Sequence, residues 1–313
     1  MQQCAGCYRT LEEIAGWSTL DIESRRNILA ALPERKAFQA LASQRCSAKN
    51  PTQAGFTVVE LLVSLAVIGI VMALLLPAIS SARESVRRAS CMSNLRQIGI
   101  AINEYHDAYR TLPTGCIEWR GFNTPRTNRQ YAWSALILPF LDERPLHSKI
   151  NFHRAFDAPE NAQVAATRVK IFECPSVPRK KTKRGPSDYG GLYGELINDR
   201  EQDDGLFLYD TVLRLIDVTD GTTHTLAVAE DVDGPDSEWI NGRNVFIQAY
   251  GINDKNAWIG DNEIRSKHRS GAMVVFVDSR TQFMSEAVRP LIVGQLITRT
   301  KGEIINQPEY AVH

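Results

Sequence analysis

The sequence lacks a charge excess and the short motifs that mark common catalytic sites. Its 36 lysines and arginines balance 36 aspartates and glutamates, which argues against a nucleic-acid-binding surface as the main function. It has no glycine-rich phosphate loop, no serine in a nucleophile-elbow context and no internal repeat. Cys4 and Cys7 form a C-x-x-C, but no second pair completes a zinc site. We therefore expect no enzyme, no cofactor and no nucleic-acid partner.

The most prominent feature that is present is one long apolar stretch. Residues 56–76 are all apolar or small except Thr57, Glu60 and Ser64, and a helix of this length crosses a bilayer core of roughly 30 Å. A carboxylate within such a span costs about 2.5 to 3.5 kcal/mol, so Glu60 needs a partner or an interfacial position. Pro77 follows, and a proline inside a spanning helix kinks it. We expect at least one membrane insertion; a plain signal anchor is the simplest alternative.

The junction between Gly55 and Phe56 resembles the cleavage site of the type IV prepilin family. A residue without a Cβ lets a protease approach the backbone closely. In that family a leader peptidase cuts after a glycine, methylates the new N-terminal residue and requires a glutamate at the fifth mature position. The resemblance implies cleavage after Gly55, a methylated Phe56 and Glu60 as the required glutamate. It also matches Pro77 to the proline that commonly kinks pilin helices.

The same resemblance implies a location and a set of partners. Basic residues flank the apolar stretch on both sides and do not decide its orientation. The resemblance does, and it implies one crossing of the bacterial inner membrane with the head outside the cytoplasm. The implied partners are prepilin peptidase and other pilin-like subunits, which contact the N-terminal helix. In that family the glutamate pairs with the N-terminal amine of a neighbouring subunit.

The sequence divides into an unusual leader, a stem and a head. The expected boundaries are a leader at 1–55, a transmembrane half of the stem helix at 56–77, an amphipathic half at 78–112 and a globular head at 113–313. Type IV leaders are short and basic, whereas this one is long and has weak helical patterning from Thr10 to Leu41. We interpret residues 1 to about 45 as either a dispensable leader or the product of a misplaced start codon, with Arg45 and Lys49 as the functional basic flank.

Apolar residues at spacings of three and four predict that the stem helix continues beyond Pro77 and packs on the head. Pro113 is expected to end it. The predicted apolar stripe consists of Val86, Ala89, Leu95, Ile98, Ile102, Tyr105 and Tyr109.

The head is predicted to be mostly antiparallel β, which makes the whole chain α+β. One hairpin is predicted from residues 273–277 and 281–284, and a second from 213–218 and 225–229 joined through Asp220 and Gly221. Short helices are predicted at 134–142, 157–169 and 288–298.

Several segments beyond the stem resemble a large bacterial group of pilin-like proteins of unknown function, sometimes labelled solute-binding-like. They include C-M-S-N-L-R-Q-I-G from Cys91, I-F-E-C-P-S at 171–176 and I-D-V-T-D-G-T-T-H-T-L-A-V-A-E at 216–230. The group also has a C-terminal motif of histidine, nine residues, aspartate and glycine, which His268 and Asp278 match. Ser279 stands where that motif has glycine. If the glycine serves a turn with positive φ, the serine must strain or shift it.

Three sets of head residues are candidates for a site. Because the head is expected outside the cytoplasm, its cysteines can be oxidised, and the resemblance favours a Cys91–Cys174 disulfide since both lie in the family-like segments. His268 and Asp278 can meet across a turn, but two ligands do not make a metal site, so we favour a histidine that holds the hairpin end. The acidic loop is a weak calcium candidate for which we favour a solvated turn; it contains Asp231, Asp233 and Asp236.

Two functions of different classes follow from these features. The first is a structural or assembly protein, a pilin or pseudopilin subunit. The alternative is a membrane-anchored extracytoplasmic protein that binds a solute or an envelope polysaccharide. Exposed aromatic rings in loops would support the alternative, and packing of these rings in the core would not; the candidates are Trp119, Trp239 and Trp258.

Overall fold

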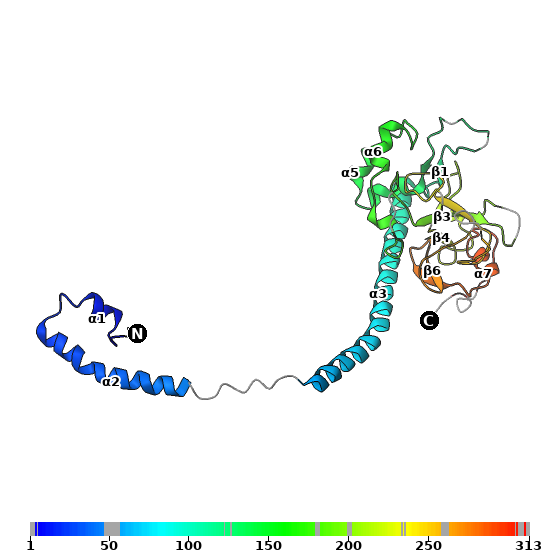
Figure 1. Ribbon diagram of the computed structural model, residues 1–313. Coiled ribbons are helices and arrows are strands. Elements are labelled where there is room, and N and C mark those ends of the chain that lie inside the picture. The colour runs from blue at the N-terminus through cyan, green and yellow to red at the C-terminus, as the bar shows by residue number, and fades with distance from the viewer. Residues whose placement is uncertain are drawn as a thin grey trace. The chain divides into compact units, whose positions relative to one another are not determined.

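The computed structural model has two compact units, Met1–Leu74 and Leu75–His313 (Figure 1). It describes residues 4, 6–46, 57–121, 123–125, 127–178, 182–198, 202–232, 234, 236–257, 263–303, 305 and 310 of the 313-residue chain. Gly55, Phe56, Asp233 and Trp258, which the sequence analysis singled out, lie outside these residues.

The leader forms two helices, α1 (Leu11–Ala15) and α2 (Ile22–Cys46). A capping box starts α1, because the Thr10 hydroxyl accepts from the N–H of Glu13 while the Glu13 carboxylate accepts from the N–H of Thr10. Arg35 of α2 donates to both oxygens of Glu13, at 2.8 and 3.0 Å. The weak helical patterning therefore corresponds to a helix pair that a bidentate ion pair holds together.

The stem is one 52-residue helix, α3 (Val58–Tyr109), with Pro77 inside it. It ends at Tyr109, four residues before the predicted stop at Pro113. The reason is that Arg110 adopts a left-handed conformation, φ 62°, and its N–H bonds to the carbonyl of His106. The buried residues of α3 begin at Cys91. Val86, predicted to belong to the apolar stripe, is 70% exposed. Glu84 and Arg88, two positions on either side of it, contact the head, so Val86 lies on the opposite face of the helix.

The head contains a five-stranded sheet in the order β5-β3-β4-β6-β7. Its neighbours pair antiparallel except β3 with β5, so the predicted α+β class with a mostly antiparallel head is confirmed. The strands are β3 (Tyr189–Glu195), β4 (Leu226–Glu230), β5 (Val245–Gln248), β6 (Gly271–Phe276) and β7 (Thr281–Ser285).

The hairpin predicted near the C-terminus is confirmed as β6 and β7, with Met273 opposite Phe283. The hairpin predicted from residues 213–218 and 225–229 is wrong. Only its second half is a strand, β4, which pairs with β3 and β6. Residues Leu215–Asp217 form a short 3₁₀ helix instead, because the Asp217 carboxylate accepts from the N–H of Arg214 and closes a local turn.

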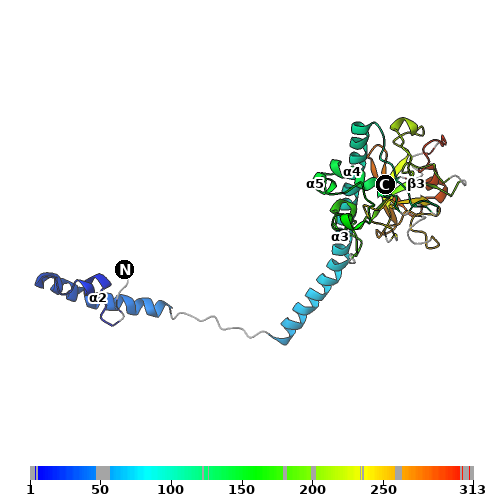
Figure 2. The ribbon, with the colours of Figure 1, turned by 90° about the horizontal axis from the view of Figure 1, so that it is seen from above.

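Alternating residues of β6 build two cores on opposite faces of the sheet. Met273 and Val275 belong to the core that includes the stem residues Leu95 and Ile98. The intervening residues face a second core that contains α7 (Pro290–Gln295). Both views place the strands between α3 and the C-terminal segment that carries α7 (Figures 1 and 2).

Smaller elements complete the head. The two-residue strands β1 (Cys116–Ile117) and β2 (Tyr131–Ala132) pair with each other. The three predicted helices are shorter than expected, at α4 (Trp133–Ile137), α6 (Ala162–Ala165) and α7. A 3₁₀ helix, Leu138–Phe140, follows α4 because Pro139 lacks the N–H that an α-helix would need there. A further short helix, α5, spans Arg144–His147.

The turn between β6 and β7 docks on the stem. Ser279 has a φ of 68°, which confirms that this position of the motif requires a left-handed conformation. Asn103 of α3 donates to the carbonyl of Val277 at 2.8 Å and to the Ser279 hydroxyl at 2.9 Å. Gly99 permits this approach, since a Cβ there would lie 2.8 Å from a methyl carbon of Val275. The serine therefore replaces glycine at the cost of strain but gains a hydrogen bond to the stem.

Candidate functional site

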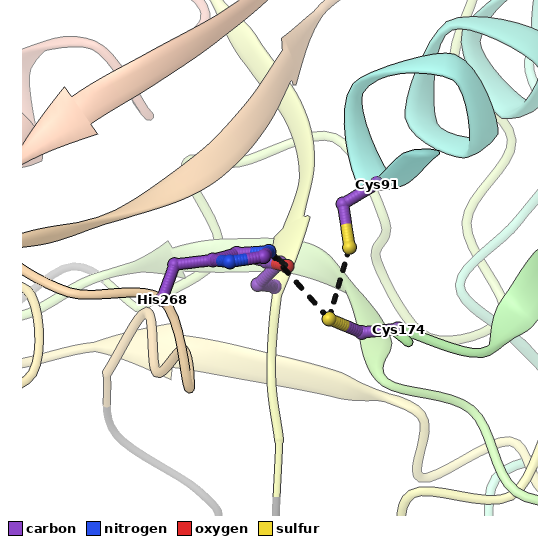
Figure 3. A group of neighbouring side chains, drawn as sticks. Cys91, Cys174 and His268 are labelled. Atoms are coloured by element: carbon purple, nitrogen blue, oxygen red, sulfur yellow. Dashed lines mark hydrogen bonds and ion pairs between the residues drawn. The ribbon is translucent and has the colours of Figure 1, made fainter. Parts of the chain in front are cut away.

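Four buried side chains with metal-binding atoms converge beneath the stem. They are Cys91 of α3, Cys174 in the loop before β3, Glu230 at the end of β4 and His268 just before β6. Their two sulfurs, one carboxylate oxygen and one ring nitrogen all lie within 4.8 Å of one another. Figure 3 shows the side chains of Cys91, Cys174 and His268 pointing toward one another. We call these four residues the stem-head cluster.

Backbone hydrogen bonds fix the cluster. The N–H of Cys174 donates to a carboxylate oxygen of Asp188 at 2.5 Å. One oxygen of Glu230 accepts from the N–H of Met273 on the adjacent strand β6 at 2.8 Å. The N–H of His268 donates to the hydroxyl of Ser266. Each of these three residues is thus oriented by groups outside the cluster.

His268 has a different partner on each ring nitrogen. Its Nδ1 lies 2.5 Å from a carboxylate oxygen of Glu84 on α3. Its Nε2 lies 3.6 Å from the sulfur of Cys174 and 3.4 Å from Oε1 of Glu230. Burial disfavours the charged ring, but the contacts with Cys174, Glu230 and Glu84 outweigh it and raise the pKa of His268 to about 10.

The two cysteines predicted to pair are neighbours in the structure. Their sulfurs lie 2.9 Å apart, beyond the 2.03–2.05 Å typical of a disulfide, and both residues carry thiols. The contact with Cys91, together with burial, raises the pKa of Cys174. The structure brings the predicted partners together, and the disulfide bond itself stays a prediction.

The other predicted site residues do not gather at the cluster. Asp278 lies at the β6–β7 turn, where its carboxylate accepts from the N–H of Arg280, so the partners of His268 are not the ones that the motif suggested. Asp236 of the acidic loop forms an ion pair with Arg243 at 3.1 Å. Asp231 is buried, and its backbone bonds to Asp188.

The aromatic residues considered for ligand binding have different environments. Trp239 is fully buried and donates its ring N–H to the carbonyl of Thr167, so it is part of the core. Trp119 is half-buried and stacks on Tyr209 with ring centroids 3.9 Å apart. Arg243 lies over the same Trp119 ring. Of the two candidate tryptophans that the structure describes, only Trp119 lies in a position compatible with the ligand-binding hypothesis.

Glu60 lies at the first turn of α3 and forms a capping box with Thr57. Its carboxylate accepts from the N–H and the hydroxyl of Thr57, at 2.9 and 2.8 Å, and its own N–H donates to that hydroxyl. Among the described residues, α3 is the one helix long and apolar enough to cross a membrane, and none of its apolar window is buried.

Comparison with known families places these features in context. Residues 80–259, more than half of the chain, match a family described as Protein of unknown function (DUF1559). The chain belongs to the DUF1559 family. Residues 50–76 match the prokaryotic N-terminal methylation motif. No curated protein and no solved structure matches the chain.

These matches confirm the resemblance to type IV prepilins and to the pilin-like group of unknown function. The methylation motif implies processing by prepilin peptidase, and with the exposed apolar helix it indicates a single-pass protein of the cell envelope. In this DUF1559 protein the motif covers Gly55, Phe56 and Glu60, and the family match covers three of the four cluster residues.

Residues 1–36 match a third family, Protein of unknown function (DUF1289). The sequence analysis missed this similarity and considered the segment either a dispensable leader or the product of a misplaced start codon. The match covers α1 and the first part of α2, including the Glu13–Arg35 pair. The T-L-E-E sequence at Thr10, a capping-box pattern, was the available signal of an ordered helix start.

The sequence analysis also missed Glu84 and Glu230 as partners of His268. It assigned Cys91 and Cys174 to a disulfide and His268 to a hairpin, and it did not consider the three together. One signal was available, because Cys91, Cys174, Glu230 and His268 each lie in a different family-like segment.

Proposed function

We propose that this DUF1559 protein is a pilin-like or pseudopilin-like subunit with a structural or assembly role rather than a catalytic one. Its leader is removed after Gly55, its new N-terminus is methylated at Phe56, and α3 then anchors the head in the inner membrane. The observation that carries the proposal is the exposed apolar half of α3. Every residue from Val58 to Leu76 is exposed, and an apolar surface of this size is not left in contact with water.

The first part of α3 requires either lipid or neighbouring helices of the same kind. Within one chain the Glu60 carboxylate accepts hydrogen bonds only from Thr57 among the described residues, and these leave its negative charge in place. An uncompensated charge in hydrocarbon is costly. Cleavage at Gly55 creates an amine at Phe56, close in sequence to Glu60. The amine of an adjacent subunit neutralises the carboxylate, and this pairing favours assembly over an isolated anchor.

Both covalent steps are chemically simple. Water hydrolyses the peptide bond between Gly55 and Phe56, which releases the leader with a carboxylate end and leaves an amine on Phe56. A methyl group then passes from a sulfonium donor to that amine, which loses a proton. The peptidase supplies the catalysis, so the subunit contributes only the recognised sequence.

Intact-mass and N-terminal analysis of the chain extracted from membranes tests the processing. We expect the wild type to start at methylated Phe56 and Gly55→Ala to retain the leader. Gly69→Ala is the matched control, because a Cβ at Gly69 meets nothing within 4 Å, and we expect it to be processed normally. A wild-type chain that keeps its leader in the native host would contradict the proposal.

A second variant separates assembly from processing. Glu60→Gln keeps the size of the side chain but removes the charge that pairs with an amine, so we expect a processed chain that no longer enters the filament or pseudopilus fraction. Glu104→Gln, at an exposed position of the same helix, is expected to assemble like the wild type. Undiminished assembly of Glu60→Gln would show that the pairing is not required.

A further inference from the structure

We propose that Cys91, Cys174, Glu230 and His268 form a structural zinc site that links the stem helix to the head. Two thiolates, one imidazole and one carboxylate make a complete tetrahedral set, which is typical of zinc sites without an open position. Thiolate ligands disfavour calcium and magnesium, which prefer oxygen. This inference is independent of leader processing, and the two can fail separately.

The distances within the cluster approach those of a zinc tetrahedron. Zinc–sulfur bonds of about 2.3 Å and zinc–nitrogen or zinc–oxygen bonds of about 2.0 to 2.2 Å imply edges of roughly 3.8 Å between two sulfurs and 3.3 to 3.5 Å for the other pairs. The separations of 3.6 Å from Cys174 to His268 and 3.4 Å from His268 to Glu230 agree with these edges. The sulfurs of Cys91 and Cys174, 2.9 Å apart, must separate by roughly 0.9 Å to match a zinc tetrahedron.

Glu84 provides the outer support that metal-binding histidines usually have. A carboxylate that accepts a hydrogen bond from one ring nitrogen fixes the tautomer and aims the other nitrogen at the metal. Glu84 holds Nδ1 of His268 at 2.5 Å, which leaves Nε2 facing the sulfur of Cys174. Arg87 in turn holds the Glu84 carboxylate at 2.6 Å. Glu84 and Cys91 are seven residues apart, so they lie on the same face of α3.

A second observation independently points to a cation. Oε1 of Glu230 is buried and has no hydrogen-bond partner among the described residues, although the other oxygen accepts from Met273. A buried carboxylate oxygen without a hydrogen bond costs free energy, and native structures rarely leave one. This oxygen is also the atom of Glu230 that lies 3.4 Å from His268. A zinc ion at the centre of the cluster satisfies it.

A disulfide between the same cysteines is the competing outcome. The observed sulfur separation of 2.9 Å exceeds the length of a disulfide bond by about as much as it falls short of the sulfur–sulfur edge of a zinc tetrahedron. An oxidising compartment favours the disulfide. The two states exclude each other, because oxidation consumes both thiolates and leaves only Glu230 and His268 as ligands. The chemical state of Cys91 and Cys174 therefore decides the proposal.

The test measures zinc and thiol state on the full chain extracted from membranes in detergent without reductant. A Cys4→Ser/Cys7→Ser/Cys46→Ser background removes the three thiols of the leader. We expect one zinc per chain by elemental analysis and native mass spectrometry, and alkylation of Cys91 and Cys174 only after the zinc is chelated. A Cys91–Cys174 disulfide in peptide mapping, with no stoichiometric zinc, would overturn the proposal.

Variants in the same background locate the metal. We expect Cys174→Ser and Glu230→Gln to lower the zinc content at least tenfold. Glu230→Gln keeps the side-chain volume and an acceptor for the N–H of Met273, so it preserves the fold, which circular dichroism checks. Cys116→Ser is the matched control, since Cys116 is an equally buried head cysteine that lies outside the cluster and whose thiol contacts the carbonyl of Ile117. It should retain one zinc.

Cobalt substitution gives a second readout. Co²⁺ bound in place of zinc should show the visible bands of a tetrahedral site and a near-ultraviolet band from thiolate ligands. We expect the thiolate band to weaken in Cys174→Ser and to persist in Cys116→Ser. Full zinc content or an unchanged cobalt spectrum in Cys174→Ser would place the metal elsewhere and refute the assignment.

Discussion

Substitutions at Ser279 test the strained turn by which the head docks on the stem. In Ser279→Ala the strained backbone remains while the hydrogen bond from Asn103 is lost. In Ser279→Gly the hydrogen bond is lost as well, but the left-handed conformation becomes unstrained. The two variants therefore differ only in the cost of the backbone conformation and in the freedom of the unfolded chain.

The magnitude follows from the φ of 68° at this position. A left-handed conformation costs an L-residue about 1 to 2 kcal/mol, and the extra freedom of glycine in the unfolded chain offsets about 0.5 to 1 kcal/mol of that gain. We expect Ser279→Gly to be more stable than Ser279→Ala by about 1 kcal/mol. The wild type should resemble Ser279→Gly, because its hydrogen bond contributes about 0.5 to 1.5 kcal/mol.

Urea unfolding of the full chain in detergent, followed by tryptophan fluorescence, measures this difference, since Trp133 and Trp239 are both buried in the head. Ser285 in strand β7 is the matched control. We expect Ser285→Gly to be less stable than Ser285→Ala by about 0.5 to 1 kcal/mol, because the extended backbone of a strand gives glycine no advantage. If Ser279→Ala equals or exceeds Ser279→Gly in stability, the turn does not impose a left-handed conformation and the reasoning fails.

Two further predictions concern the stem and the leader. Ile98→Ala should lower the stability of the head by about 2 to 5 kcal/mol in the same urea assay, because Ile98 is fully buried against the sheet, whereas Val86→Ala should change it by less than about 0.5 kcal/mol. Equal effects would show that Val86 also packs against the head. The hydrogen bonds from Arg35 and Thr10 lower the pKa of Glu13 to about 2. The Glu13–Arg35 pair should therefore stabilise the leader fully at pH values above the ordinary glutamate pKa. This stabilisation should be lost as the pH falls through about 2. Carbon NMR of the Glu13 carboxyl should show this midpoint, and Arg35→Gln should raise it; an unchanged midpoint would mean that the pair does not form in solution.

Local patterns were sufficient to predict the main elements of this chain. A continuous apolar run predicts α3, and a short apolar run followed by a turn and a second segment predicts β6 and β7, because each depends on neighbouring residues alone. The strand predicted at 213–218 failed since a local bond between Arg214 and Asp217 competes with strand pairing. Val86 was misplaced because it lies two positions from Glu84 and Arg88, which contact the head, and two positions turn a helical side chain to roughly the opposite face.

The sequence by itself determined the processing motif, the apolar half of the stem and the α+β class of the head. Each depends on short segments whose residue types act through local geometry or through contact with lipid. Only the tertiary structure decided the stem-head cluster. Cys91 lies 83 positions from Cys174, and Cys174 lies 94 positions from His268, so no local spacing links them. Their meeting depends on β4, β6 and the stem packing together, which brings thiols, carboxylate and imidazole into one buried volume.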